Sequence, residues 1–253
     1  MDSAVLLEAM REAAQRVRAA LDGLEDWGPA DTRPGQYKSD LVADEAALPV
    51  LLEAGLSILS EESGVTEASP GSLLAVLDPV DGSTNASRNI PWYATSICVL
   101  DEVGPLVALV ANQATGERYE AVRGEGASRN GEFIVPRSEA SLSRAVLGLS
   151  GYPPTYLGWR QFRALGAAAL DLCAVADGTL DGYVDCSQAG HAPWDYLGGA
   201  LVCSEAGAAV ADAYGRELTV RGESERRIPV AGCTESLLRQ VVTARKEAYG
   251  GLG

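Results

Sequence analysis

Two aspartates stand three residues apart around a proline in the segment LDPVDGSTN, residues 77–85. Pro79 fixes its own φ and has no N–H, so the chain can fold back there. The Asp78 and Asp81 carboxylates and the Val80 carbonyl could then face one point, and three such oxygens suit a hard cation such as Mg²⁺. A plain Asp-Gly turn followed by a capped helix explains the fragment equally well.

Gly82 and the hydroxyl residues after it extend this candidate site. Glycine lets a ligand approach the backbone closely, and Ser83 and Thr84 can open a helix whose first N–H groups are free to receive a phosphate. The next β-like run begins only near Thr95, which disfavours a tight hairpin here. Gly82, Ser83 and Thr84 are therefore candidate phosphate-binding residues.

Two other segments supply further carboxylates. ILSEESG places Glu61 and Glu62 between an apolar run and the strand that leads to Asp78. HAPWDYLGG places Asp195 at the start of a predicted helix, where aspartate is also a common N-terminal cap. Each segment has a purely structural explanation, as a charged loop or a helix cap, but the three segments together favour a shared acidic site.

The composition limits the class of partner. With 253 residues, 47% of them apolar, the chain can bury a core in one or two domains. A net charge of −15 argues against nucleic acid and anionic membranes as partners, whereas bound divalent cations would still admit an anionic small substrate. Five cysteines without a C-x-x-C pair, no signal-peptide pattern and no membrane-length apolar run predict a cytoplasmic protein with reduced thiols.

The first third of the chain has a helical pattern. Apolar residues at helical spacing predict one helix over about the first 24 residues. Residues 26–40 contain Gly-Pro and Pro-Gly pairs and predict a mobile loop. Helical composition resumes over 43–59, where Pro49 should kink or restart the helix.

From Ser72 onward the pattern changes to short β-rich runs, including an Asn-Gly hairpin signal between Ser128 and Phe133. Strands and helices alternate after residue 138, up to a closing helix from Thr234. These layers predict an α/β or α+β fold on two sheets. We expect residues 1–137 to form an N-terminal α+β part with the metal-binding motifs, and residues 138–253 an α/β part that closes the site.

Three motifs, SEES (60–63), DPVDGSTN (78–85) and WDYLGGALVCSEAGA (194–208), resemble the signatures of the inositol monophosphatase family, whose members are metal-dependent, lithium-sensitive phosphomonoesterases. The resemblance covers nearly the whole chain, because the N-terminal helices, the KSDLV segment, the GEGASRNGE hairpin and the ALGAAALDLC helix occur in family order. It implies a layered αβαβα sandwich, of the inositol monophosphatase/fructose-1,6-bisphosphatase type, that forms a homodimer.

The resemblance also implies roles for single residues. Glu61, Asp78 and the Val80 carbonyl would bind one Mg²⁺, Asp78, Asp81 and Asp195 would bind a second, and a third metal position stays open. Li⁺ should inhibit such a site.

The residues around the water and the substrate follow from the same comparison. Glu61 and the Ser83 hydroxyl would activate the water, and Lys38 would close near the metals. Asp185 matches an acidic residue that binds substrate hydroxyls, although the segment from it to Trp194 is longer than usual. His191 lies in this longer segment, and a surface or capping role explains it better than catalysis, with a substrate contact as the alternative.

The sequence departs from the family pattern in DLVADEAALP. Ala43 stands where the family has threonine, and Ala46 stands where it has the aspartate that works with the Ser83-type hydroxyl. Either Asp44 or Glu45 replaces this carboxylate after a local shift, or the base is weakened. We predict that Asp44 replaces it.

These observations predict a Mg²⁺-dependent phosphatase that hydrolyses a small polyol or sugar phosphate monoester. Inositol monophosphate is the default substrate, and histidinol phosphate, fructose 1,6-bisphosphate or a specialised biosynthetic sugar phosphate are alternatives. The loss at Ala46 motivates a rival hypothesis, a weakly active or inactive relative that serves as a metal-bound protein-interaction module.

Overall fold

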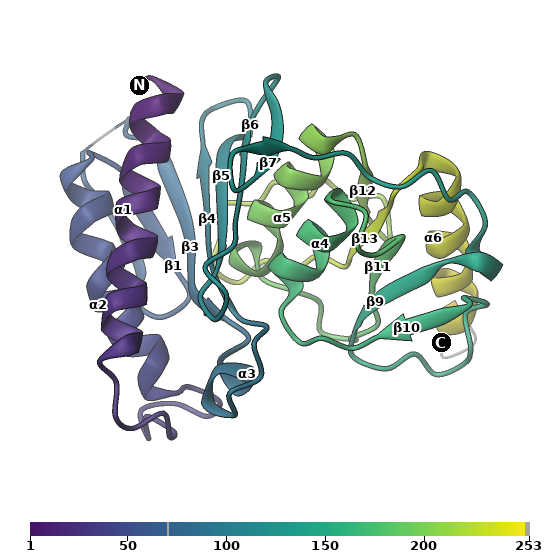
Figure 1. The fold of residues 1–253 in the computed structure, drawn as a ribbon, viewed down its shortest axis with the longest axis horizontal. Helices are drawn as coiled ribbons and strands as arrows, with labels where there is room; N and C mark the ends of the chain where they lie inside the picture. Colours follow the sequence, from purple (N-terminus) through teal and green to yellow (C-terminus); the bar gives the residue numbers. More distant parts are fainter. Residues whose placement is uncertain (70, 251–253) are drawn as a thin grey trace.

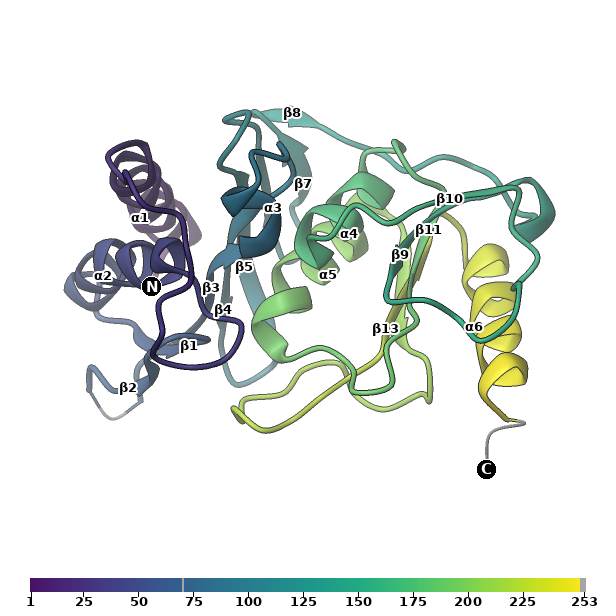
Figure 2. The same cartoon turned by 90° about the horizontal axis from the view of Figure 1, so that it is seen from below.

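The N-terminal residues form two helices that pack against each other in the first layer of the fold (Figures 1 and 2). The computed structural model describes residues 1–69 and 71–250. Helix α1 (Ser3–Asp22) begins after Asp2, whose carboxylate accepts a hydrogen bond from the Ala4 N–H at 2.9 Å. Its apolar stripe, from Leu6 to Leu21, is buried, which confirms the predicted first helix.

Helix α2 (Lys38–Glu53) passes through Pro49 without a break, so the predicted restart of the helix is wrong. Proline removes one hydrogen bond from a helix, but the next two residues, Val50 and Leu51, are buried in the core and hold the backbone in place. Lys38 is the first residue of this helix, whereas the sequence pattern placed it in a mobile loop.

An eight-stranded sheet forms the second layer, in the order β2-β1-β3-β4-β5-β6-β7-β8. Its strands are β1 (Ser57–Ser60), β2 (Gly64–Thr66), β3 (Leu74–Asp81), β4 (Ala94–Leu100), β5 (Pro105–Asn112), β6 (Arg118–Val122), β7 (Gly126–Arg129) and β8 (Glu132–Phe133). Only the β1–β3 pair is parallel in this sheet as described. The predicted Asn-Gly hairpin is confirmed, because Asn130 (φ 53°) and Gly131 (φ 84°) join β7 to β8.

Two helices, α4 (Ala168–Ala176) and α5 (Pro193–Ala206), lie between this sheet and a second one (Figure 2). The glycine pair of α5 allows this close packing. A Cβ on Gly198 would lie 2.7 Å from Ser96 Oγ of β4, and a Cβ on Gly199 would lie 2.7 Å from the Ala169 carbonyl of α4. The segment WDYLGGALV therefore fits between a strand and a helix only with glycine at both positions.

The second sheet has the order β10-β9-β11-β13-β12, and helix α6 (Glu235–Gly250) packs on its outer face (Figure 1). Its strands are β9 (Val146–Ser150), β10 (Gln161–Arg163), β11 (Gly182–Asp185), β12 (Ala209–Asp212) and β13 (Pro229–Gly232). The order of layers is thus α1/α2, first sheet, α4/α5, second sheet and α6. This confirms the predicted αβαβα sandwich.

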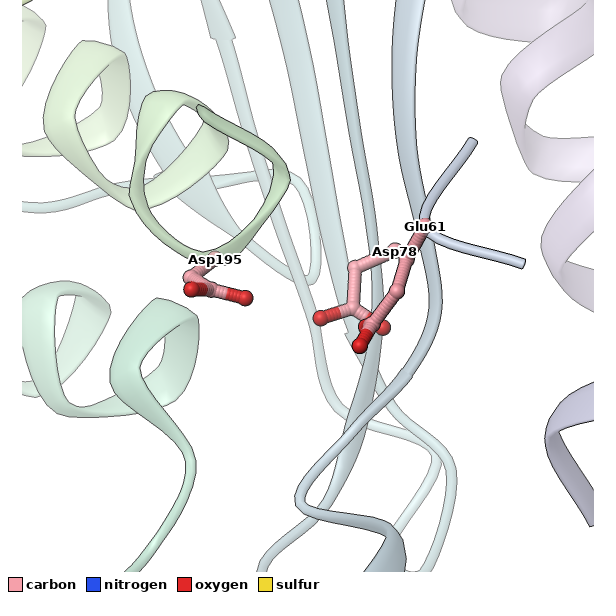
Figure 3. A group of neighbouring side chains, drawn as sticks. All are labelled: Glu61, Asp78 and Asp195. Atoms are coloured by element: carbon pink, nitrogen blue, oxygen red, sulfur yellow. The ribbon is translucent and has the colours of Figure 1, made fainter. Parts of the chain in front are cut away.

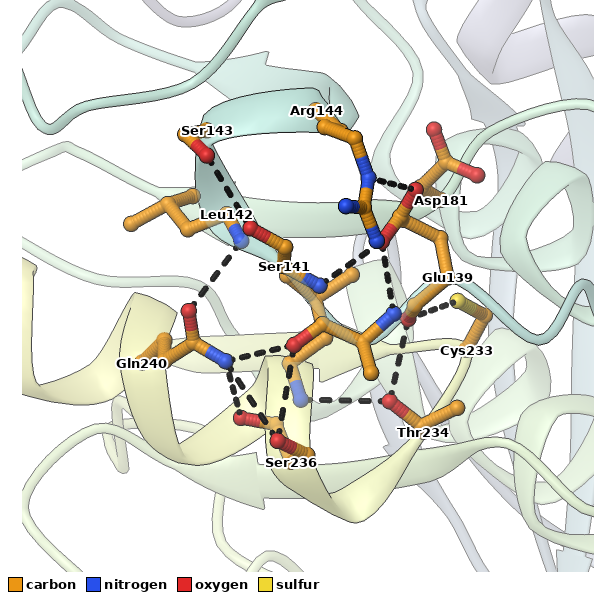
Figure 4. Close-up of polar contacts among 12 residues, drawn as sticks. Glu139, Ser141, Leu142, Ser143, Arg144, Asp181, Cys233, Thr234, Ser236 and Gln240 are labelled. Carbon is orange, nitrogen blue, oxygen red and sulfur yellow. Dashed lines mark hydrogen bonds and ion pairs between the residues drawn. The ribbon is translucent and has the colours of Figure 1, made fainter.

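The chain that enters the second sheet is fastened to the start of α6 (Figure 4). The Glu139 carbonyl accepts hydrogen bonds from Thr234 Oγ1 at 3.1 Å and Cys233 Sγ at 3.2 Å. Gln240 of α6 binds the short 3₁₀ helix η1 (Leu142–Arg144), since its Oε1 accepts from the Leu142 N–H at 3.1 Å. These contacts fix the position of β9, and therefore of Ser150 at its end.

All five cysteines are buried and carry free thiols. Among residues 1–69 and 71–250, no helix combines the length and the apolar composition needed to cross a membrane.

Candidate active site

Strand β3 carries Asp78 and Asp81 on either side of a one-residue bulge. Asp78 pairs with Ser96 of β4 and Asp81 with Ala94, so three steps on β3 oppose two on β4. The expectation that the strand ends at Asp78 is wrong, because β3 continues to Asp81. The bulge accommodates Pro79, which has no N–H for the ladder, and its carbonyl accepts a hydrogen bond from the Thr95 hydroxyl at 2.9 Å.

Three carboxylates from distant parts of the chain converge beside this bulge (Figure 3). Glu61 follows β1, Asp78 lies on β3 and Asp195 lies in the first turn of α5. Each offers one oxygen, and these oxygens all lie within 4.8 Å of one another. We call these three residues the acidic cluster.

The electrostatics of the acidic cluster favour a bound cation. Burial raises the pKa of Glu61 to about 8, and the neighbouring charges of Asp195 and Glu62 add to this effect. Burial also raises the pKa of Asp78 well above its ordinary value, followed by the charges of Glu61 and Asp81. Three carboxylates at this spacing repel one another when ionised, and an all-oxygen, acidic donor set is what Mg²⁺ binds.

Asp81 lies beside the acidic cluster but turns toward α4. Its Oδ2 accepts a hydrogen bond from the Ala169 N–H at 2.7 Å, near the start of that helix. Burial, followed by the charge of Asp195, raises the pKa of Asp81 to about 7. The structure therefore brings Glu61, Asp78 and Asp195 together and leaves Asp81 outside the group of mutually close oxygens.

The residues after the bulge form a tight turn into the short helix α3 (Ser83–Ser87). Gly82 has φ 92°, and a Cβ there would lie 3.1 Å from two backbone oxygens, those of Trp92 and Gly166, so only glycine fits. The Ser83 hydroxyl donates to the Val80 carbonyl at 3.0 Å. Thr84 is exposed, and its Oγ1 lies 3.3 Å from the Tyr37 hydroxyl.

Two buried carboxylates of α2, Asp40 and Asp44, lie about one helical turn apart and contact different neighbours. Asp44 is buried, and its Oδ1 accepts a hydrogen bond from Ser60 Oγ at 2.5 Å, directly before Glu61. Asp40 is also buried, and its carboxylate accepts hydrogen bonds from the Tyr37 N–H at 2.8 Å and from Ser39 Oγ at 3.2 Å, with the Ser83 side chain nearby. Burial raises the pKa of both aspartates.

Ala43 is fully buried, and Ala46 packs partly buried against the core between α2 and the first sheet. Asp40 was not among the predicted site residues. Its only sequence signal is its place in KSDLV, within the first turn of α2.

The loop before α2 places cations near the acidic cluster. Arg33 donates to the Glu61 carbonyl at 3.0 Å and to Glu62 Oε2 at 2.7 Å. Lys38, a predicted substrate residue, is paired with Asp26 and is half exposed. Arg33 was also missed by sequence reasoning, because nothing in DTRPGQ marks it as different from any loop arginine.

His191 connects the second sheet to the acidic cluster. Its Nδ1 lies 3.0 Å from Asp195 Oδ2, and its Nε2 lies 3.1 Å from both the Tyr183 hydroxyl and Ser150 Oγ. Burial acts to lower the pKa of His191, but the hydrogen bond and charge of Asp195 outweigh it and raise the pKa to about 9. The surface role expected for His191 is therefore wrong, since its side chain is only 16% exposed and belongs to a polar network.

Asp185, predicted to bind substrate hydroxyls, ends β11 beside this network. Its Oδ1 lies 3.9 Å from His191 Nε2 and accepts a hydrogen bond from the Ser187 N–H at 2.7 Å. Its buried Oδ2 has no hydrogen-bond partner in the described part of the chain. An unpartnered buried carboxylate oxygen is costly, so Oδ2 is available as an acceptor.

Comparisons with known proteins agree with this fold and site. The family model described as "Inositol monophosphatase family" matches residues 39–248. A "Fructose-1,6-bisphosphatase/inositol-1-monophosphatase" from Methanothermobacter thermautotrophicus is 35% identical over 236 residues, which cover 83% of this chain and 84% of that protein. A "Nus factor SuhB" from Pasteurella multocida is 30% identical over 230 residues, which cover 83% and 85% of the two chains.

Among solved structures, an inositol monophosphatase from Anabaena superposes with a TM-score of 0.79 at 27% identity and covers 96% of each chain. The family-model match spans most of the chain, and it includes all three carboxylates of the acidic cluster. The chain therefore belongs to the inositol monophosphatase family, a family of phosphatases.

Proposed function

We propose that this protein is a Mg²⁺-dependent phosphatase that hydrolyses a small polyol or sugar phosphate monoester. The observation that carries the proposal is the convergence of Glu61, Asp78 and Asp195, whose oxygens lie within 4.8 Å of one another, with Asp78 buried and the other two half-buried. The family membership supports the reaction class, and the names of relatives that include both inositol-1-monophosphatase and fructose-1,6-bisphosphatase support small phosphorylated polyols and sugars as substrates.

The donor set fits Mg²⁺, because it consists of carboxylates without a lysine or arginine among them. Glu61, Asp78 and Asp195 would hold the ion or ions, with the Val80 carbonyl and Asp81 at the edge of the site. When bound, divalent cations would neutralise the phosphate oxygens and lower the pKa of a water molecule.

The chain's own residues would orient the reactants. The Ser83 hydroxyl donates its proton to the Val80 carbonyl, so its oxygen can accept a hydrogen bond from a water molecule and orient it. Asp44 would act on the water or support Glu61 through Ser60. The N–H groups of Gly82 to Thr84 would bind the phosphate, and the free Oδ2 of Asp185 would accept a hydrogen bond from a substrate hydroxyl. Lys38 would need to leave Asp26 to reach the phosphate.

A phosphate-release panel tests the proposal. Inositol 1-phosphate, fructose 1,6-bisphosphate and histidinol phosphate are incubated with the protein in Mg²⁺, in a chelator, and in Mg²⁺ plus Li⁺. We expect release only with Mg²⁺, inhibition by Li⁺, and a loss of at least about 10³-fold in Asp78→Asn. Asp22→Asn, an exposed substitution on α1, is the matched control and should keep full activity.

A second candidate function is protein interaction by a weakly active, metal-bound homodimer. It is favoured by the alanine at position 46 and by the similarity to proteins named Nus factor SuhB. Metal binding without phosphate release from any of the three esters would support this function and contradict the first. Light scattering in solution tests the homodimer in either case.

A further inference from the structure

A cleft of about 460 Å³ opens beside the acidic cluster. It is lined by Arg33, Glu61, Trp194, Glu223, Ser224 and Arg226. Glu61 belongs to the acidic cluster and Trp194 directly precedes Asp195, so a substrate whose phosphate lay at the cluster could extend into this cleft. The two arginines are the cationic groups of its lining.

The two arginines differ in whether a carboxylate is paired with their guanidinium group. Arg33 is bound to the Glu62 carboxylate at 2.7 Å, so its charge is already compensated. Within residues 1–69 and 71–250, Arg226 donates only to the backbone carbonyls of Glu223 at 2.8 Å and Glu225 at 3.0 Å. Among the described residues it forms no ion pair with a carboxylate, which makes it the cation of the cleft that is open to an anion.

The position of Arg226 is fixed relative to the acidic cluster. Its guanidinium carbon lies 5.7 Å from the centroid of the Trp194 ring, a cation–π contact. The next residue, Arg227, exchanges two backbone hydrogen bonds with His191, at 2.7 and 2.9 Å. Arg226 is thus held next to Trp194 directly and next to His191 through Arg227. Both of these residues lie within four positions of Asp195 in the sequence.

We propose that Arg226 binds a second anionic group of the substrate, remote from the phosphate that is hydrolysed. The protein carries a net charge of −15, so an additional negative group on a substrate would be repelled unless a local cation met it. A guanidinium without a carboxylate partner, stacked on an aromatic ring, is suited to a phosphate or carboxylate oxygen. This inference rests on the proposed phosphatase function and assigns the cleft as its specificity determinant.

A matched pair of substrates tests the proposal. Fructose 1,6-bisphosphate and fructose 1-phosphate differ only in the second phosphate, and kcat/KM is measured for each with the wild type and Arg226→Gln. We expect the wild type to prefer the bisphosphate, and Arg226→Gln to lose about tenfold or more on the bisphosphate and less than about twofold on the monophosphate. Arg221→Gln, an exposed arginine of the same segment that lines a different cavity, should leave both values unchanged.

Equal losses on both substrates, no loss on either, or a wild type without preference for the bisphosphate would overturn the proposal. Calorimetric titration of the same two sugars in Ca²⁺ provides a readout that does not depend on turnover. If the bisphosphate binds more tightly than the monophosphate only when Arg226 is present, the anion subsite is supported even where no phosphate is released, and only the phosphatase function fails. If Arg226→Gln binds both sugars as the wild type does, the subsite is rejected.

Discussion

His191 Nδ1 lies 3.0 Å from Asp195 Oδ2, and this contact joins a residue at the edge of the second sheet to one of the three carboxylates of the acidic cluster. The same Asp195 oxygen accepts a hydrogen bond from the Ala192 N–H at 2.9 Å. With Oδ2 held by two donors, the carboxylate of Asp195 has a fixed orientation toward Glu61 and Asp78. Such outer contacts commonly decide how well a metal is held.

Replacing His191 should therefore lower the affinity of the site for Mg²⁺ without removing any of the residues expected to bind the metal. We expect His191→Ala to raise the Mg²⁺ concentration for half-maximal phosphate release by about 10–100-fold. His191→Asn, whose amide can still donate to Asp195, should recover part of this loss. The measurement is a Mg²⁺ titration of activity at saturating substrate. Identical titration curves for the wild type and His191→Ala would show that His191 does not position Asp195.

The carboxylates of α2 can be separated by substitution. Asp44→Ala should lower kcat by about 10²–10⁴-fold if this residue takes the part of the carboxylate that is missing at Ala46. Glu45→Ala is the matched control, because Glu45 is the exposed neighbour on the same helix. Asp40→Asn is measured in parallel.

Comparing the activity losses of these variants shows which carboxylate acts as the general base. Full activity in Asp44→Ala would contradict the prediction for that residue. A loss in Asp40→Asn together with full activity in Asp44→Ala would move the role to Asp40, whose side chain lies near that of Ser83.

Gly82 should be irreplaceable for steric reasons. We expect Gly82→Ala to lower the free energy of unfolding by about 2–4 kcal/mol, because strain at positive φ adds to contacts of 3.1 Å with two backbone oxygens. Gly124→Ala isolates the first effect, since Gly124 has φ 80° but no atom within 4 Å of the added Cβ. It should cost about 1–2 kcal/mol. Urea denaturation measures both, and equal costs would show that the contacts around Gly82 relax freely.

Asp212 should make the free energy of unfolding depend on pH in the acidic range. Desolvation acts to raise the pKa of this buried carboxyl group. Hydrogen bonds from the Arg216 side chain and from the N–H groups of Ile228, Arg216 and Tyr214 outweigh this effect and lower the pKa to about 2. The folded pKa lies below the ordinary value of 3.8, so the contribution to stability is complete above about pH 4 and is lost as the pH falls toward 2.

Asp212→Asn should therefore reduce the free energy of unfolding by about 1–3 kcal/mol at pH 7, with a smaller difference from the wild type at pH 3. Asp22→Asn, which removes an exposed carboxylate 3.7 Å from Arg18, should change it by less than about 0.5 kcal/mol. Denaturation at both pH values provides the measurement. A difference for Asp212→Asn that grows toward low pH would contradict the assignment.

Short-range patterns predicted much of the fold. The buried apolar stripe of α1, the Asn130-Gly131 hairpin and the start of α5 follow from residue spacing and turn chemistry within a few residues of sequence. The start of α2 was placed too late because no serine, threonine or asparagine precedes it. The cap comes instead from inside the helix, where Asp40 Oδ2 accepts a hydrogen bond from the Tyr37 N–H at 2.8 Å.

The sequence could predict which carboxylates form the acidic cluster, but not which neighbouring side chains contact them. The motifs marked Glu61, Asp78 and Asp195, and the structure brings them together. Which carboxylate of α2 faces Ser83 depends on the rotation of a helix against the sheet, and residues 40 and 44 lie on the same helical face. The role of His191 depends on a contact with Arg227 of the chain leading into β13, which no local pattern indicates.

The acidic cluster should be a divalent-metal site, and a crystal grown with Mn²⁺ and phosphate would show the metal directly. Anomalous scattering locates Mn²⁺ independently of any assumption about the ligands. We expect an anomalous peak about 2.0–2.3 Å from carboxylate oxygens of Glu61, Asp78 and Asp195, and no such peak in Asp78→Asn. Anomalous peaks only elsewhere on the protein, or none at saturating Mn²⁺, would contradict it.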